Sequence, residues 1–359
     1  MITEYKRYIV SKFLTSLLKI SLIFCSIILI MNLFEEINFF KDVENQNLSM
    51  PLFLTIINLP SVLFEIFPFV FLIASINFFI DIIDANEINT FKILGITNLK
   101  FVQILSVTTF LIGIIIITIF YSVSSSLKFA YLDIKNKYSK DDKYLAVITE
   151  NGLWVRDMYK DKIKFINAEK INNQDLINIT ISEFSSNYKL ERSITAKKAD
   201  IKYNKWILYD GVINLQNDIK KFKNLKFETN FNLDKILSLF DNLSSQNMFK
   251  LYSLKKDYKT LGYSTDKING YQHKIYSYPI YLTLMVIIGT ILMISTKHNS
   301  SKIFKIIAGI IISVIVYYIN YFFSVVIEAQ EIHYTFSIWG PQLIFSTIVF
   351  LNLVRLNEK

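Results

Sequence analysis

Six stretches of mostly apolar residues dominate the pattern of this chain. They run from Leu14 to Asn38, Pro60 to Ile83, Leu99 to Ser122, Ile275 to Ile294, Ile303 to Ile327 and Ile338 to Leu356. A helix needs about 20 apolar residues to cross a bilayer. The sequence therefore predicts six transmembrane helices, three on each side of a long polar interval.

Two features at the start of the chain refine this prediction. The apolar run Leu52–Leu59 is too short to span, so it predicts a separate short helix at the membrane interface. The first span is too long for a signal peptide, and no small-residue cleavage pattern follows Phe34. We therefore expect the first span to remain in the mature protein.

In the polar interval, apolar and polar residues alternate with the period of two that is typical of strands. Strands are predicted at Tyr144–Ile148, Gly152–Arg156, Lys162–Ile166, Ile177–Ile181, Ser193–Ile201, Trp206–Tyr209, Val212–Gln216 and Phe222–Thr229. Turn signals such as Asn172-Asn173 and Asp210-Gly211 separate them. Many short strands favour a sandwich or jelly roll. A helical part follows from Leu233 to about Tyr258, and Gly262–Gly270 is predicted to be a linker.

Composition and charge support this division. The chain of 359 residues is 52% hydrophobic and only 19% charged, whereas soluble domains average about 25% charged residues. The formal net charge of +9 would suit nucleic acid or an anionic membrane surface. Residues 128–274 hold 27 basic and 18 acidic residues, while the rest of the chain holds 12 of each. The excess therefore belongs to the inserted domain, and no nucleic acid is expected as a partner.

The short flanks of the spans predict the orientation. One side carries ten basic residues: Lys6, Arg7, Lys12, Lys92, Lys100, Lys297, Lys302, Lys305, Arg355 and Lys359. The short connections on the other side carry only Lys41. By the positive-inside rule both termini are cytoplasmic, and residues of about 128–270 lie outside the cytoplasm.

Signatures of catalysis and metal binding are missing from the sequence. The single cysteine, Cys25, excludes an intrachain disulfide, and the three histidines (His273, His298 and His333) lack metal-ligand spacing. No GxxxxGK[ST], HExxH or GxSxG pattern occurs. We therefore expect a protein that binds and couples, with no enzymatic activity, cofactor or metal of its own.

The connection between the second and third spans, about residues 84–96, is the candidate for coupling. Asp84 or Asn86 could cap a helix that Gly95 ends. On this helix Ile88, Phe91 and Leu94 form an apolar stripe, flanked by Glu87 and Lys92. The stripe could rest on the bilayer, or it could dock into a groove on a cytoplasmic partner.

Three segments carry a resemblance to a known family. Glu87–Thr97 resembles the coupling segment of the LptF/LptG permeases, Asn151–Asp157 resembles a Gly-Leu-Trp-basic-Asp strand typical of the LptG branch, and Trp339-Gly340-Pro341 opens the last span as in that family. The order of three spans, a strand-rich domain and three spans extends the resemblance over essentially the whole chain. The chain is thus similar to LptF/LptG family permeases, and most like LptG.

The resemblance implies a permease subunit of an ABC transporter in the bacterial inner membrane. It would pair with an LptF-like permease, dock an LptB-like ATPase dimer, and pass lipopolysaccharide to a periplasmic bridge of LptC-like and LptA-like jelly-roll proteins. Spans one and five would form lateral gates. The residues that would couple to the ATPase are Glu87, Ile88, Phe91, Lys92, Leu94 and Gly95.

The resemblance also suggests where substrate would bind, with one departure. First spans of the LptG branch usually carry several basic residues at the outer end, whereas this chain has only Lys41 there. Lys128, Lys135 and Lys137 are the alternative source of positive charge for substrate phosphates. Trp154 and Phe165 are the positions at which lipid inside the jelly roll would be probed.

The predicted fold is therefore a membrane α-helical protein with an inserted extracytoplasmic all-β jelly-roll domain. Its parts are an N-terminal half (residues 1–127), the jelly-roll domain (128–270) and a C-terminal half (271–359). The alternative function is a membrane-anchored scaffold or sensor whose outer domain binds an envelope lipid without transport. A self-contained secondary transporter is less supported, because the two halves show no obvious internal similarity.

Overall fold

The computed structural model describes residues 4–41, 48–138, 153–159, 162–172, 175–185, 187–215, 218–233, 236, 242–260, 264–295, 301–328 and 333–357. The chain divides into two compact units. One comprises Met1–Tyr131 and Asn269–Lys359, and the other comprises Leu132–Ile268.

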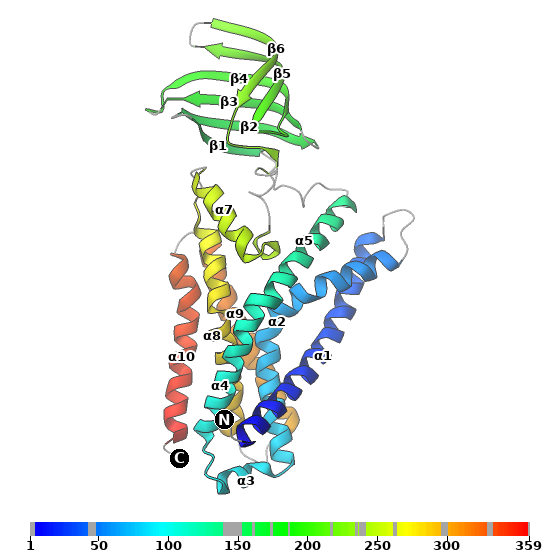
Figure 1. Cartoon of the computed structure of the whole chain (residues 1–359), viewed down its shortest axis with the longest axis vertical. Helices are drawn as coiled ribbons and strands as arrows, with labels where there is room; N and C mark the ends of the chain where they lie inside the picture. Colours follow the sequence, from blue (N-terminus) through cyan, green and yellow to red (C-terminus); the bar gives the residue numbers. More distant parts are fainter. Residues whose placement is uncertain are drawn as a thin grey trace. The chain divides into compact units, whose positions relative to one another are not determined.

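Six helices in the described residues are long and apolar enough to cross a membrane, which confirms the six predicted spans (Figure 1). They are α1 (Glu4–Phe40), α2 (Ser49–Asp84), the third span built from α4 (Asn98–Ile115), the π-helix η1 (Ile116–Phe120) and α5 (Tyr121–Tyr138), then α8 (Asp266–Ser295), α9 (Lys302–Glu328) and α10 (Tyr334–Asn357). The connection between α2 and α4 contains the short helix α3 (Glu87–Ile93).

Helix α2 forms the centre of the membrane unit. The most apolar part of α2 is 72% buried, against 22% for α1 and 17% for α9. Two glycines let neighbouring helices approach α2 closely: a Cβ on Gly289 would lie 2.1 Å from the Ser75 Oγ, and one on Gly309 would lie 2.3 Å from the Ile76 Cδ1. Small residues at such contacts are typical of helix packing in membranes, where van der Waals contact drives association.

The prediction of a separate interfacial helix before Pro60 is wrong, because residues 52–59 belong to α2. Figure 1 shows α2 bending along its length, as proline residues inside a helix commonly cause. Pro68 has no N–H to donate to the Phe64 carbonyl four residues earlier. The Tyr278 hydroxyl of α8 donates to that carbonyl at 2.5 Å, so the group lost to Pro68 is satisfied by another helix.

The inserted domain is built on one antiparallel sheet. Its strands are β1 (Leu153–Tyr159), β2 (Lys162–Asn172), β3 (Asp175–Phe184), β4 (Leu190–Asp200), β5 (Lys205–Leu215) and β6 (Asp218–Glu228). They lie side by side in sequence order, so the described strands form a meander, whereas a jelly roll folds its strands into two sheets (Figure 1). Helix α7 (Met248–Thr260) supplies the second half of the helical part expected from Leu233 to about Tyr258. The inserted all-β domain itself is confirmed.

Two details of the sequence prediction are wrong, and a third concerns residues outside those that the structure describes. Asp210-Gly211 is no turn: both residues lie inside β5, where Asp210 has φ 49° and a Cβ on Gly211 would lie 2.2 Å from the Thr195 carbonyl oxygen. The linker prediction is wrong from Asp266 onward, because α8 begins there and the Ser264 hydroxyl accepts a bond from the Asp266 N–H. The predicted strand Tyr144–Ile148 lies outside the described residues.

The core of the β unit occupies one face of the sheet. Leu153 and Val155 of β1 are buried, as are alternate residues of β2, β3 and β4. Trp206 belongs to this core and is fully buried, and its indole N–H donates to the Phe231 carbonyl at 2.9 Å. The period of two thus separates a packed inner face from an outer face.

Candidate functional site

The short helix α3 ends as the sequence predicts but begins differently. Gly95 has φ 71°, its N–H donates to the Lys92 carbonyl at 3.0 Å, and the Ile96 N–H donates to the Phe91 carbonyl at 2.9 Å. These two bonds define a Schellman C-terminus, which confirms Gly95 as the stop. At the other end Asn86 precedes the helix with φ 55°, and its side chain makes no capping bond.

The expected apolar stripe of α3 is divided between two faces. Phe91 is only 7% exposed and packs edge-to-face on Phe101 of α4, with ring centroids 5.3 Å apart. Ile88 is half-buried against the same core. Leu94 is 66% exposed, and its neighbour Ile93, which the sequence analysis did not single out, is 86% exposed. The inward face anchors α3, and the outward face presents Ile93 and Leu94 beside the exposed Lys92.

An ion pair of Glu87 links α3 to α1. Both of its carboxylate oxygens accept from the Lys12 ammonium, at 2.8 and 2.7 Å, and one also accepts from the Tyr8 hydroxyl at 2.7 Å. Burial alone would raise the pKa of the Glu87 carboxyl, but the hydrogen bonds from Lys12 and Tyr8 outweigh it and the pKa is lowered. Glu87 is therefore ionised at neutral pH and already engaged within the chain.

The structure places the four lysines proposed for substrate in different surroundings. Lys41 is exposed. Lys128 forms an ion pair with Glu65 at 3.3 Å, and Lys137 pairs with Asp133 one turn earlier at 2.9 Å. Lys135 is buried. Lys128 and Lys137 therefore already have an acidic partner each.

Glu36, near the C-terminal end of α1, is a buried acidic residue that nothing in the local sequence distinguishes from its charged neighbours. It is 1% exposed and accepts from the Tyr131 hydroxyl at 2.6 Å. Because Tyr131 lies 95 positions further along the chain, no local pattern reveals this pair.

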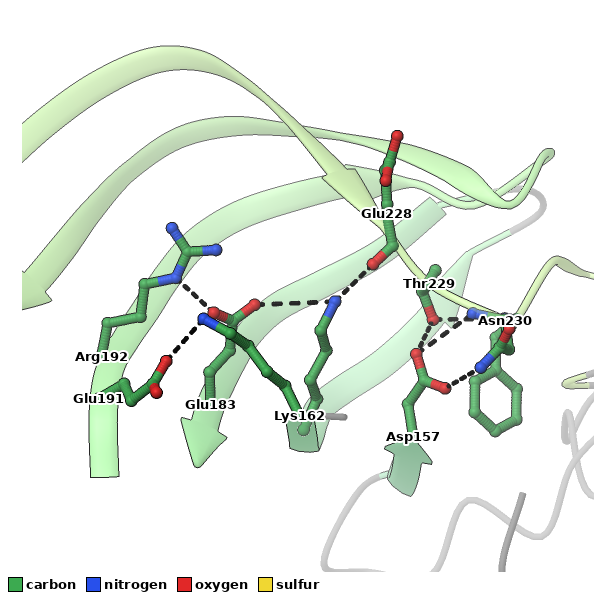
Figure 2. Close-up of polar contacts among 10 residues, drawn as sticks. Asp157, Lys162, Glu183, Glu191, Arg192, Glu228, Thr229 and Asn230 are labelled. Atoms are coloured by element: carbon green, nitrogen blue, oxygen red, sulfur yellow. Dashed lines mark hydrogen bonds and ion pairs between the residues drawn. The ribbon is translucent and has the colours of Figure 1, made fainter. Parts of the chain in front are cut away.

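A ladder of alternating charge crosses the inner face of the β sheet. The strand register places Asp157 opposite Lys164, Lys164 opposite Glu183, and Glu183 opposite Arg192. The Lys164 ammonium lies 3.7 Å from the Glu183 carboxylate. The other oxygen of that carboxylate accepts from the Arg192 guanidinium (Figure 2). Nearby, Lys162 pairs with Glu191 at 2.6 Å. Opposite charges on neighbouring strands stabilise their pairing.

The same ladder connects the two edges of the sheet. The Lys164 ammonium donates to the Glu228 carbonyl, at the end of β6, at 2.6 Å. Asp157 accepts from the Thr229 hydroxyl at 2.6 Å, and from the backbone and side-chain amides of Asn230 at 3.2 and 2.9 Å (Figure 2). We call Asp157, Lys164, Thr229 and Asn230 the polar latch. It joins β1 and β2 to the end of β6, although β1 and β6 are opposite edges of the sheet order.

The latch also explains the aspartate of the Asn151–Asp157 segment. Asp157 is fully buried, and burying a polar group is costly unless hydrogen-bond donors such as these satisfy it. Burial lowers the pKa of the Lys164 ammonium, while the nearby carboxylates of Glu183 and Asp157 oppose that shift. Asp157 therefore has a structural role: it joins β1 to the residues that follow β6.

Trp154 and Phe165 lie on the outer face of the sheet. Trp154 is 62% exposed between the buried Leu153 and Val155. Phe165 alternates with the buried Lys164 and Ile166 and packs edge-to-face on Phe184, at 5.6 Å between ring centroids. Successive strand residues point to opposite faces of the sheet. A lipid cross-linking probe that is meant to reach the core-facing side should therefore replace a residue next to Trp154 or Phe165.

Together, these features define a class of protein: a multi-pass membrane protein in which an all-β domain is inserted between two three-helix halves and a short anchored helix follows the second span. The family model of the lipopolysaccharide export system permease LptF/LptG matches residues 7–355. The chain belongs to this family, as its sequence suggested, and is a lipopolysaccharide export permease of the inner membrane. No curated protein matches the chain.

Proposed function

We propose that the chain is a permease subunit of an ABC transporter that extracts lipopolysaccharide from the inner membrane. It would pair with a second, LptF-like permease and be driven by an LptB-like ATPase dimer. A bridge of LptC-like and LptA-like proteins would receive the lipid. The observation that carries this proposal is the orientation of α3: Phe91 is buried and anchors the helix, while Ile93 and Leu94 are exposed on its outward side.

The outward face of α3 has the properties of a docking surface. Ile93 and Leu94 are large apolar side chains exposed at the end of a helix that is itself fixed to the bundle. An apolar helix face of this kind binds in a groove of a partner. Lys92 and Gly95 border it, while Ile88, Phe91 and Glu87 would contribute by holding α3 in place.

The exposed faces of α1 and α9 suit a partner permease and lipid. Both helices present long rows of apolar side chains on the surface of the unit, such as Leu18 and Leu22 on α1 and Ile307 and Ile311 on α9. The resemblance assigns the lateral gates to these two spans. Their low burial within a single chain supports that assignment, because gate helices need a second surface to close against.

The proposed orientation and substrate contacts follow the charge. Both termini would be cytoplasmic and the β unit periplasmic, because basic residues flank the spans on one side. Lys41 remains the exposed candidate for a substrate phosphate. To bind a phosphate, Lys128 would have to leave Glu65, and Lys137 would have to leave Asp133. Lys135 would bind it from a buried position. Trp154 and Phe165 would meet lipid or a neighbouring domain on the outer face.

Replacing the outward apolar residues of α3 by aspartate tests the docking surface. We expect Ile93→Asp or Leu94→Asp to weaken binding of the LptB-like ATPase by at least about tenfold, because a buried aliphatic side chain contributes about 1.5–3 kcal/mol. The measurement is titration of the ATPase against the detergent-solubilised permease pair.

The matched control is Phe249→Asp, since Phe249 of α7 is 85% exposed in the other unit. This variant should bind the ATPase like the unmodified chain. Normal ATPase binding by both α3 variants would exclude α3 as the docking helix.

A further inference from the structure

Helix α7 presents exposed aromatic and basic side chains on one side. Phe249 is 85% exposed and Tyr252 is 54% exposed. Lys256 and Lys259 are exposed as well. Successive members of this set are three or four residues apart, which places all of them on the same side of the helix. We call this set, Phe249, Tyr252, Lys256 and Lys259, the outer face of α7.

The opposite side of α7 is buried. Leu251 and Leu254 are only 0% and 6% exposed, so the helix is held in a fixed orientation by its apolar side. Large aromatic side chains that gather on the exposed side of a fixed helix mark an interaction surface. The composition of the outer face indicates what kind of surface it fits.

That composition suits an anionic lipid surface. Aromatic side chains are enriched at the membrane–water interface, and lysines can keep their ammonium groups among lipid phosphates while their stems lie on apolar surface. Helix α7 carries four lysines, Lys250, Lys255, Lys256 and Lys259, and one acidic residue, Asp257. A helix that combines exposed apolar and basic residues binds anionic lipid through apolar burial and charge attraction together.

The connection to α8 brings α7 within reach of the membrane surface. Helix α7 ends at Thr260, and α8, a membrane span, begins at Asp266. The six Cα–Cα steps between these residues cover at most about 22 Å. The polar start of α8, residues 266–274, rises about 14 Å above the apolar part of the span. The connection is therefore long enough for α7 to lie at the level of the lipid headgroups.

We propose that α7 is an additional membrane contact of the inserted domain, and that its outer face binds the anionic phospholipid surface on the side where α8 begins. In this arrangement Phe249 and Tyr252 lie among the headgroups, and the two lysines of the outer face pair with phosphate groups. Because α7 belongs to the same compact unit as the β sheet, the contact restrains that unit at the membrane. The inference goes beyond the proposed function, since it requires only that α8 spans a bilayer.

Quenching by spin-labelled lipid tests this contact in the full-length protein. Ser253, an exposed neighbour of the outer face, is replaced by cysteine in a Cys25→Ser background and labelled with bimane. The protein is reconstituted in vesicles of phosphatidylethanolamine and phosphatidylglycerol that contain a lipid with a nitroxide headgroup. We expect quenching at least about twofold stronger than for the same label at Tyr203→Cys, because a bound α7 holds its label at headgroup depth. Tyr203 is the matched control, since it is 66% exposed, lies beside Lys202 and belongs to the same unit.

Substitutions in the outer face distinguish a specific contact from mere closeness to the vesicle. Phe249→Asp, and Lys256→Glu combined with Lys259→Glu, should each reduce the quenching at Ser253→Cys by at least about half, because apolar burial or charge attraction is lost. Phosphatidylcholine in place of phosphatidylglycerol should also reduce it. Lys202→Glu, which reverses an exposed lysine elsewhere in the unit, is the control and should leave the quenching unchanged.

Three results would overturn the proposal. The first is quenching at Ser253→Cys that is no stronger than at Tyr203→Cys, and the second is quenching that the substitutions in the outer face do not change. The third is weak quenching together with loss of a periplasmic protein partner from the Phe249→Asp variant, which would assign the outer face to that protein. Each of them leaves the proposed export function standing. Titration of the ATPase in detergent contains no bilayer, so Phe249→Asp remains a control there.

Discussion

Single buried acidic side chains in this chain accept hydrogen bonds from residues that lie far along the sequence. Asp157 of β1 accepts from Thr229 and Asn230, more than 70 residues later, and Glu36 of α1 accepts from Tyr131. Burying an unpaired carboxylate is so unfavourable that each site requires such donors. At this scale the fold depends on a few specific hydrogen bonds in addition to apolar burial.

Asp157 offers the clearest test of this residue-scale account. Asp157→Ala should lower the free energy of opening of β1 and of the end of β6 by about 3 kcal/mol, because the Thr229 hydroxyl and the Asn230 amides all lose their acceptor. Hydrogen exchange of the full chain in detergent, followed by mass spectrometry of peptides from residues 153–159 and 218–233, measures this change.

The control for this substitution is Asp218→Ala, at the exposed start of β6. It should change amide protection by less than about 0.5 kcal/mol, as for most surface substitutions. Equal protection in the Asp157→Ala and Asp218→Ala variants would show that the polar latch does not hold the sheet edges together.

At the scale of elements, close contacts at glycine residues hold the membrane helices together. Gly289 of α8 lies against Ser75 and the Leu72 carbonyl of α2, with no room for a side chain. Tyr278 of α8 satisfies the Phe64 carbonyl that Pro68 leaves without a donor. Packing and one hydrogen bond thus fix α8 against the central helix.

Gly289→Leu should separate α2 from α8 and lower the thermal stability of the detergent-solubilised protein. Overpacking of this kind costs about 1–3 kcal/mol or more. Gly340→Ala is the matched control, because its new Cβ would lie 3.4 Å from the Phe323 ring, an ordinary contact. Size-exclusion chromatography after heating compares the two. A Gly289→Leu variant as stable as Gly340→Ala would contradict the close-packed α2–α8 contact.

The elements themselves could largely be predicted from the sequence, because their hydrophobic periods are long and clear. The six spans follow from apolar length, and the strands from alternation. The errors arose where tertiary contacts override local signals. Pro60 reads as a helix boundary but lies inside α2, and Asp210-Gly211 reads as a turn but lies in β5 because β4 approaches Gly211 closely.

The candidate site was less predictable for the same reason. The position of α3 and its end at Gly95 follow from local chemistry, but its exposed face does not. Because Phe91 packs on Phe101, Ile93 and Leu94 face outward. The sequence of this seven-residue helix does not show which of its apolar residues are buried and which are exposed. The outward placement of Trp154 depends on strand register, since a shift of one residue exchanges the two faces.

At the scale of the molecule, charge and apolar surface are distributed as an export permease requires. The formal excess of +9 lies within residues 128–274, and the remaining residues carry equal numbers of acidic and basic groups. The membrane unit leaves apolar rows of α1 and α9 uncovered, and presents α3 at the end of α2. These are the surfaces that the proposed pairing with a second permease, with lipid and with an ATPase would use.

The most direct test of the central claim is to deplete the protein in its own bacterium and quantify lipopolysaccharide in separated inner and outer membranes. The account predicts that surface lipopolysaccharide falls and that newly made lipopolysaccharide accumulates in the inner membrane. Complementation by the unmodified chain should restore delivery, and complementation by Leu94→Asp should not. Unchanged delivery of lipopolysaccharide to the surface after depletion, as expected for a scaffold or sensor, would contradict it.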